Sequence, residues 1–201
     1  GSFMDSVVKK VSIFQGLAVA LILVAAIFTI TIVVRNSIVS DIQSDFQQRV
    51  KDVKATFEVL NESIKVTAKS ASNSLEKRFF DIEMEKDEFV MINGVKTNVL
   101  KSNGEIINSN NVLMDDFTNM SGAVATIFVK VENDFYRIAT SLQKEDGTRA
   151  IGTYLTDKNP AFKNIVDKKD YIGAAKLFGK NYMTVYKPII QDDEVIGVFF
   201  L

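Results

Sequence analysis

The longest apolar pattern in the chain runs from Val11 to Val34, which is 24 residues without a charge. As an α-helix this stretch is about 36 Å long, enough to cross a hydrocarbon core of roughly 30 Å. A secretory signal has a shorter apolar core of about 7–15 residues. A helix in a soluble core seldom stays apolar on every face for this length. We therefore expect an uncleaved transmembrane helix at 11–34, with a signal peptide as the alternative, preceded at 1–10 by a vector-derived start and a short N-terminal segment.

Beyond Arg35 the apolar residues become periodic, with spacings of three and four residues that mark one face of a helix. No Gly or Pro occurs between Gly16 and Gly94, so nothing in this stretch interrupts a helix. The pattern predicts a long amphipathic helix over 35–90, continuous with the membrane helix. Its apolar face would pack on the sheet of its own domain, on a second copy in a homodimer, or on both. The periodic residues are Val39, Ile42, Phe46, Val50, Val53, Phe57, Leu60 and Ile64.

From Val90 onward, short runs of β-branched and aromatic residues alternate with turns rich in Asn, Asp and Gly. Such runs, separated by turns of about two to five residues, are typical of an antiparallel sheet. The predicted fold class is therefore α+β, with the sheet over 91–201 and a short helix at Asn159 to Asp167. The expected strands are Val99–Leu100 with Ile106–Ile107, then Ala123–Val131, Phe135–Gln143, Tyr171–Phe178, Tyr182–Ile190 and Val195–Leu201.

Composition removes several classes of chemistry. The 201-residue chain contains no Cys and no His, which excludes disulfides, thiolate nucleophiles, Cys/His metal sites and His-based acid–base catalysis. A net charge of −1 gives no basic surface for nucleic acid. The adjacent carboxylates Asp115–Asp116 and Asp192–Asp193 are typical of solvated turns and helix starts, and phosphate-loop and serine-elbow motifs are absent. We therefore expect a binding protein rather than an enzyme, without metal or cofactor.

Several short runs follow one another in a fixed order after the helix. They are Ala125–Phe128, Asp134–Thr140, Asp146–Thr153, Tyr171–Gly173, Leu177–Gly179, Tyr182–Thr184, Tyr186–Pro188 and Val195–Val198. As an ordered set they resemble the single Cache sensor domain of the Cache_3–Cache_2 type found in bacterial methyl-accepting chemotaxis proteins. The resemblance covers roughly Ser40 to Leu201.

This resemblance implies a topology that the flanking charges do not decide, since Lys and Arg occur at both ends of the membrane helix. It places the N-terminus in the cytoplasm and a PAS-like sensor on the periplasmic side of the inner membrane. We expect the natural protein to continue beyond Leu201 into a second membrane segment and cytoplasmic signalling modules. Chemotaxis is the expected output, with a histidine kinase or a cyclic-dinucleotide signalling protein as the alternative.

Two arginines, Arg137 and Arg149, are the candidate anchors for a ligand, because they are the only arginines after the long helix and both lie in family-like runs. A guanidinium offers a rigid donor fork suited to a carboxylate. The alternative is a surface arginine paired with Asp134 or Asp146. For Arg149 the run Asp146–Gly147–Thr148 also fits a simple hairpin turn.

Hydroxyl groups on nearby predicted strands complete the candidate site. Tyr182, Thr184 and Tyr186 share one face of their strand by period two, and the same rule puts Ser141 with Arg137. Such groups can orient a small polar ligand in an apolar pocket, although tyrosines of this kind also occur as ordinary core residues. Tyr171 would close the pocket or merely fill it.

These residues predict a small organic anion, a short carboxylate, as the ligand, since no acidic residue shares their faces. An amine or amino-acid sensor would need Asp134, Asp146 or Asp170 to turn inward. The expected partners are this ligand, the membrane and a second copy of the chain. A purely structural membrane-tethered coiled coil would explain the helix but not the sheet.

Overall fold

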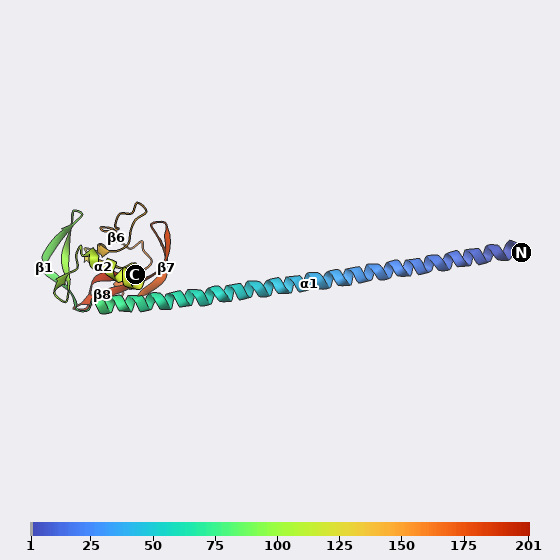
Figure 1. Ribbon diagram of the computed structural model, residues 1–201, viewed down its shortest axis with the longest axis horizontal. Coiled ribbons are helices and arrows are strands. Elements are labelled where there is room, and N and C mark those ends of the chain that lie inside the picture. Colours follow the sequence, from blue (N-terminus) through green and yellow to red (C-terminus); the bar gives the residue numbers. More distant parts are fainter. Residues whose placement is uncertain (1) are drawn as a thin grey trace. The chain divides into compact units, whose positions relative to one another are not determined.

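The computed structural model of the protein describes residues 2–201, so Gly1, the first residue of the predicted vector-derived segment, lies outside the described part (Figure 1). The chain divides into two units, residues 1–59 and residues 60–201. From Ser2 onward the first unit is helix, and the second contains the end of that helix and the strands of the described residues. The second unit carries the site described below.

Helix α1 spans Ser2–Arg78, as expected for a stretch free of Pro and, after Gly16, of Gly. It contains a segment long and apolar enough to cross a membrane. The prediction that helix continues to residue 90 is wrong, because α1 ends at Arg78 and strand β1 begins at Ile82. Asp81 between them has a left-handed φ of 59°, which is not compatible with a continuing α-helix. Leu75 and Phe79 are buried at this end, whereas the periodic residues from Val39 to Ile64 are exposed in the single chain.

A three-stranded antiparallel sheet follows, formed by β1 (Ile82–Ile92), β2 (Val95–Ser102) and β3 (Glu105–Ile106) in that order. Asn93 and Gly94 join the first two strands, and both have positive φ, as a two-residue hairpin turn requires. The predicted pairing of residues 99–100 with 106–107 exists as the β2–β3 ladder, in which Lys101 faces Ile106. Strand β1 was not predicted, because acidic and basic residues interrupt its apolar pattern.

The second sheet has six antiparallel strands in the order β6-β5-β4-β9-β8-β7. Each predicted strand of the region after residue 120 matches a strand in this sheet, which confirms the α+β class. The sequence did not predict helix α2 or the short strand β6. The elements are α2 (Asn111–Ser121), β4 (Thr126–Val131), β5 (Asp134–Thr140), β6 (Tyr154–Leu155), α3 (Phe162–Val166), β7 (Tyr171–Leu177), β8 (Lys180–Gln191) and β9 (Glu194–Phe200).

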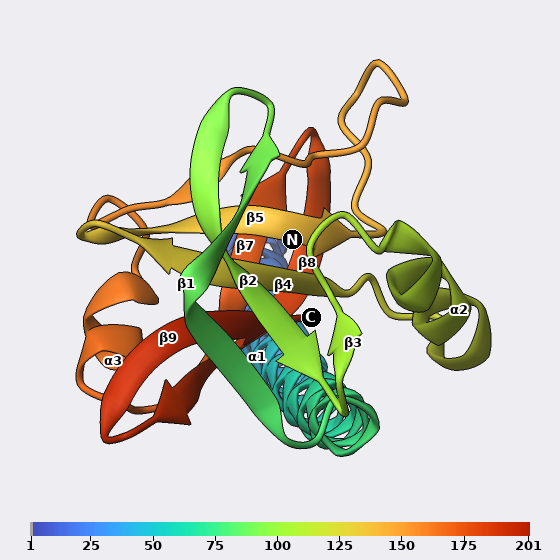
Figure 2. The same cartoon turned by 90° about the vertical axis from the view of Figure 1, so that its left-hand side faces the viewer.

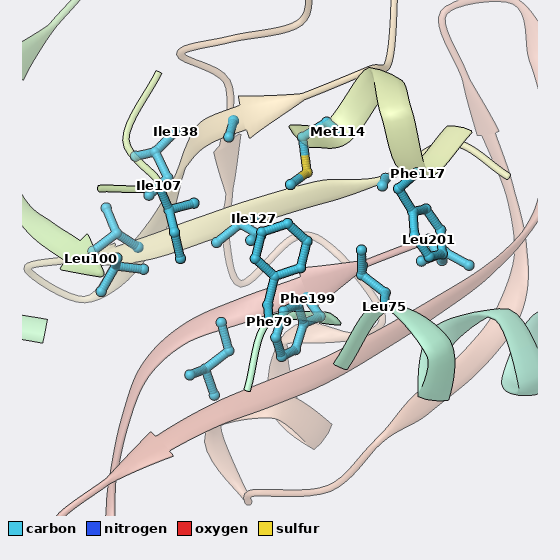
Figure 3. Close-up of a cluster of buried hydrophobic side chains, with 14 of the residues drawn as sticks. Leu75, Phe79, Leu100, Ile107, Met114, Phe117, Ile127, Ile138, Phe199 and Leu201 are labelled. Carbon is cyan, nitrogen blue, oxygen red and sulfur yellow. The ribbon is translucent and has the colours of Figure 1, made fainter. Parts of the chain in front are cut away.

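Two apolar cores cover the two faces of the six-stranded sheet. One joins the sheet to α2, to the end of α1 and to the three-stranded sheet, and includes Leu75, Leu100 and Phe117 (Figure 3). Figure 2 shows the three-stranded sheet lying across the larger one. The other core lies on the opposite face, under α3 and the segment that follows β5. Because side chains alternate along a strand, Val185 of β8 belongs to the first core and its neighbour Tyr186 to the second.

Candidate functional site

Arg137 packs against two aromatic rings of the second core, the one under α3. It is on β5, which pairs with β4, and β4 in turn pairs with β9. The residue is only 6% exposed. Its guanidinium carbon lies 4.7 Å from the centre of the Phe128 ring and 5.6 Å from that of Phe200. The side chain is therefore held among aromatic rings, where a cation gains some attraction from the ring faces but loses nearly all of its hydration.

The charge of Arg137 is only weakly compensated. Its Nε is buried and has no hydrogen-bond partner among the described residues, and its Nη1 donates to Thr126 Oγ1 over a long 3.5 Å. Burial lowers the pKa of Arg137 to about 10, and the one opposing influence is the nearby Tyr186. A buried charge normally pairs with an opposite charge or binds a ligand. Arg137 is thus the strongest indication of a ligand site in the described chain.

Tyrosines from the neighbouring strands line the same face. Tyr186 is buried on β8, with its ring 4.9 Å from Phe200 and 6.1 Å from Tyr171, and Asn159 Nδ2 donates to its hydroxyl at 3.4 Å. Burial raises the pKa of Tyr186, so its hydroxyl remains a neutral donor and acceptor near pH 7. The ring of Tyr171 lies over Gly173, where a Cβ would collide with it. The glycine therefore allows the tyrosine to turn inward.

The other two predicted residues of β8 differ in how their hydroxyls are used. Thr184 is fully buried, and its hydroxyl donates to the Gly173 carbonyl at 2.7 Å. Its proton is therefore used in a bond within the sheet and is not available to a ligand. Tyr182 is half-buried and packs at the margin of the core that holds Tyr186. The structure therefore brings Arg137, Tyr171 and Tyr186 together and places Tyr182 at the edge of this group.

Ser141 does not share the face of Arg137, so this part of the prediction is wrong. Strand β5 contains a bulge at Ile138. The adjacent β4 residues Phe128 and Ile127 face Arg137 and Ala139, so Ile138 between these two has no partner on β4. An extra residue inverts the alternation of side chains beyond it. The Ser141 hydroxyl therefore turns toward α2, where it accepts a bond from Thr118 Oγ1 at 2.6 Å.

Because of the bulge, Thr140 is the residue that lies on the same face as Arg137, where the sequence analysis expected Ser141. The Thr140 hydroxyl lies 2.6 Å from that of Thr126, which in turn accepts the bond from Arg137. Sequence reasoning missed Thr126, Thr140 and Asn159. Thr126 was detectable, since it lies two residues from Phe128 on β4 and so on the same face.

Arg149 lies outside this group of side chains and carries an ion pair. Its two terminal nitrogens donate to the two carboxylate oxygens of Asp115 on α2, at 2.7 and 2.8 Å. This contact raises the pKa of Arg149, in contrast to Arg137. The partner is neither Asp134 nor Asp146, the two that the sequence suggested. Asp146 instead accepts bonds from the backbone and hydroxyl of Thr148 within its own turn.

A cavity of about 420 Å³ opens beside α3, between apolar residues that include Phe135 and Phe162. Arg137 does not line it. The cavity bears Lys130 and Lys168 at its margin, and Lys168 pairs with Asp193 at 2.6 Å. We therefore assign the candidate site to the buried Arg137 group and not to this cavity, which is not lined by Arg137.

Comparison with protein families agrees with the architecture. Residues 32–201 match the family model described as the Cache 3/Cache 2 fusion domain. The chain belongs to this Cache family. No curated protein and no solved structure matches it. Cache domains are extracellular sensors of small molecules, and the apolar part of α1 is long enough to place such a sensor at a membrane.

Proposed function

We propose that this Cache domain senses a small organic anion, a short carboxylate, which binds Arg137. The observation that carries the proposal is the buried guanidinium, whose Nε has no hydrogen-bond partner among the described residues. A carboxylate accepts two parallel bonds from such a fork and neutralises the charge within the core. The hydroxyl of Tyr186, held by Asn159, adds a polar group that can orient the bound molecule.

The charges around the site favour an anion over an amine. Among the described residues no Asp or Glu is buried, and no acidic residue influences the pKa of Arg137. An amine or amino-acid ligand would need a carboxylate for its ammonium group. Of the residues considered for that role, Asp146 and Asp170 are exposed, and Asp134 is half-buried at the start of β5. The rival ligand class therefore lacks a partner close to Arg137.

A thermal-shift screen of the full chain in detergent micelles tests the ligand class. Acetate, propionate, lactate and pyruvate would be compared with propylamine, alanine and the neutral propionamide. A ligand at 100 times its dissociation constant adds about 2.7 kcal/mol of stability. We expect carboxylates alone to raise the melting temperature, and Arg137→Met to remove the rise. Stabilisation by amines alone, or an unchanged carboxylate response in Arg137→Met, would refute the assignment.

The output that fits this sensor is a chemoreceptor signal carried by a small displacement. Strand β8 supports a route, because Tyr186 faces the candidate site while the next residue, Lys187, reaches the other face and pairs with Glu76 of α1. A ligand that binds one arrangement of these strands more tightly shifts the population toward it, and couplings of about 1–3 kcal/mol suffice. A histidine kinase or cyclic-dinucleotide output is the alternative.

We further propose that the receptor is a homodimer joined through α1. The residues Val39, Phe46, Val53 and Leu60 form part of one apolar face of the helix and are exposed in the single chain. Apolar residues at heptad-like spacing bury this face when two helices pack side by side. The dimer also gives the signal a partner helix against which α1 can move.

A further inference from the structure

Arg149 makes three hydrogen bonds that link α2 to the end of β5. Two go to Asp115 on α2, and the third runs from Nη1 to the backbone carbonyl of Thr140 at 2.8 Å. The guanidinium therefore does more than form an ion pair, because it also holds a backbone group of the strand that carries Arg137.

Helix α2 holds the other backbone group of Thr140 as well. The Thr140 N–H donates to Asn111 Oδ1 at 3.0 Å. Asn111 and Asp115 are four residues apart, so they lie on one face of α2. Strand β5 has a bulge at Ile138 and ends at Thr140, and backbone groups at such positions lose their regular partners in the sheet. The bonds from Arg149 and Asn111 therefore satisfy Thr140 backbone groups at an irregular part of the strand.

The residue held in this way belongs to the candidate site. The Thr140 hydroxyl shares a 2.6 Å bond with Thr126 Oγ1, which accepts the bond from Arg137 Nη1. Thr140 Oγ1 also accepts from the Leu142 N–H at 3.0 Å, so its rotamer is held from two sides. Hydrogen bonds thus connect Asp115 and Arg149 to the Thr140 carbonyl, and the Thr140 hydroxyl to Thr126 and Arg137, so that Thr140 joins the two groups.

We propose that Arg149, with Asn111 and Asp115 of α2, is a positioning residue of the Arg137 site and does not itself contact the ligand. Arg149 fixes the Thr140 carbonyl, which sets the hydroxyl pair that orients the Arg137 guanidinium. The proposal rests on the proposed anion-binding function. It gives α2 a direct role in ligand affinity, although the buried residues of α2, Met114 and Phe117, belong to the core on the other face of the sheet.

Calorimetric titration of the full chain in detergent micelles with propionate tests the positioning role. We expect Arg149→Leu to weaken propionate binding about tenfold, which is the size of coupling found between residues of one hydrogen-bond network. Arg149→Lys, which can keep one of the bonds, should lie between Arg149→Leu and the wild type. The matched control is Lys101→Met, which removes a half-buried ion-pair partner of Glu85 in the three-stranded sheet. It should bind propionate as the wild type does, whatever its melting temperature.

A second readout separates positioning from general stability and does not need the ligand. Amide hydrogen exchange at Thr140 and Leu142, and the NMR signal of Arg137 Nε–H, should both change in Arg149→Leu and not in Lys101→Met. If Arg149→Leu does not fold, Asp115→Asn provides the same comparison, since it removes the charge that orients Arg149.

Unchanged affinity together with unchanged signals at Thr140 and Arg137 would overturn the positioning role. A wild-type chain that binds no carboxylate in the panel would instead refute the proposed function. In that case the Arg137 and Thr140 signals alone decide whether Arg149 orients the guanidinium.

Discussion

Replacing Arg137 by Met should make the unliganded protein more stable while removing its response to carboxylates. Burial lowers the pKa of Arg137 from an ordinary value of about 12.5 to about 10. At about 1.4 kcal/mol for each tenfold change in proton affinity, holding this charge in the core costs roughly 3 kcal/mol. The rings of Phe128 and Phe200 return about 0.5–2 kcal/mol of that cost through cation–π attraction. Met is unbranched and apolar, so it fills the space without a charge.

The net gain expected for Arg137→Met is therefore about 1–3 kcal/mol, or a rise in melting temperature of roughly 3–9 °C for a domain of this size. The folded state binds the Arg137 proton less tightly than the unfolded chain does. The penalty is consequently fully present below about pH 10 and is relieved only as the pH rises above that value, so a melt at pH 7 measures all of it.

The assay is thermal unfolding of the full chain in micelles, followed by near-ultraviolet circular dichroism of the tyrosines. The matched control is Arg149→Met, which removes an arginine that is paired and should lower the melting temperature, because Asp115 and the Thr140 carbonyl lose a donor. If Arg137→Met melts at or below the wild-type temperature, the Arg137 charge is compensated within the protein and the reasoning that makes it a ligand anchor fails.

Three further predictions concern the sheet, the bulge and the dimer. Gly197→Ala should destabilise the domain by more than about 2 kcal/mol in urea unfolding, because its Cβ would collide with the backbone carbonyl of Phe128 on β4; an unchanged midpoint would contradict the packing. Ser141→Ala should cost about 1–3 kcal/mol, because the Thr118 hydroxyl and the Ala125 N–H both lose their acceptor, yet leave carboxylate affinity unchanged in calorimetry, whereas a loss of affinity would return Ser141 to the site. Val53→Asp should abolish a concentration-dependent dimer in sedimentation, and a wild-type chain that stays monomeric at every concentration would exclude the dimer.

Periodicity predicted most of the fold because its physical cause is local. The spacing of apolar residues after Arg35 and the alternation in the strands after residue 120 both reflect which face is buried. Strand β1 was not predicted because charged residues interrupt its apolar pattern: Glu83 is exposed, and Glu85 is half-buried and pairs with Lys101. Helix α2 escaped because only Met114 and Phe117 of its 11 residues are fully buried.

For the candidate site, the sequence analysis named Arg137 and Tyr186 but misplaced Ser141 and Arg149. Arg137 and Tyr186 were selected because a guanidinium can hold an anion and a phenol can orient it, and the structure buries both side chains on one face of the sheet. The positions of Ser141 and Arg149 depended on features that leave no pattern in the sequence. The bulge at Ile138 adds one residue without a Gly or Pro to announce it. The partner of Arg149 lies 34 residues away, on a helix that was not predicted.

The most direct test of the account is the NMR signal of the Arg137 guanidinium during a titration with propionate. In the full chain labelled with ¹⁵N-arginine, the signal is assigned by its loss in Arg137→Met. A carboxylate that bonds to Nε should shift the Arg137 Nε–H resonance downfield, and the shift should saturate at the concentration at which the melting temperature reaches its plateau. Stabilisation by propionate with an unchanged Arg137 resonance would contradict the assignment of Arg137 as the ligand anchor.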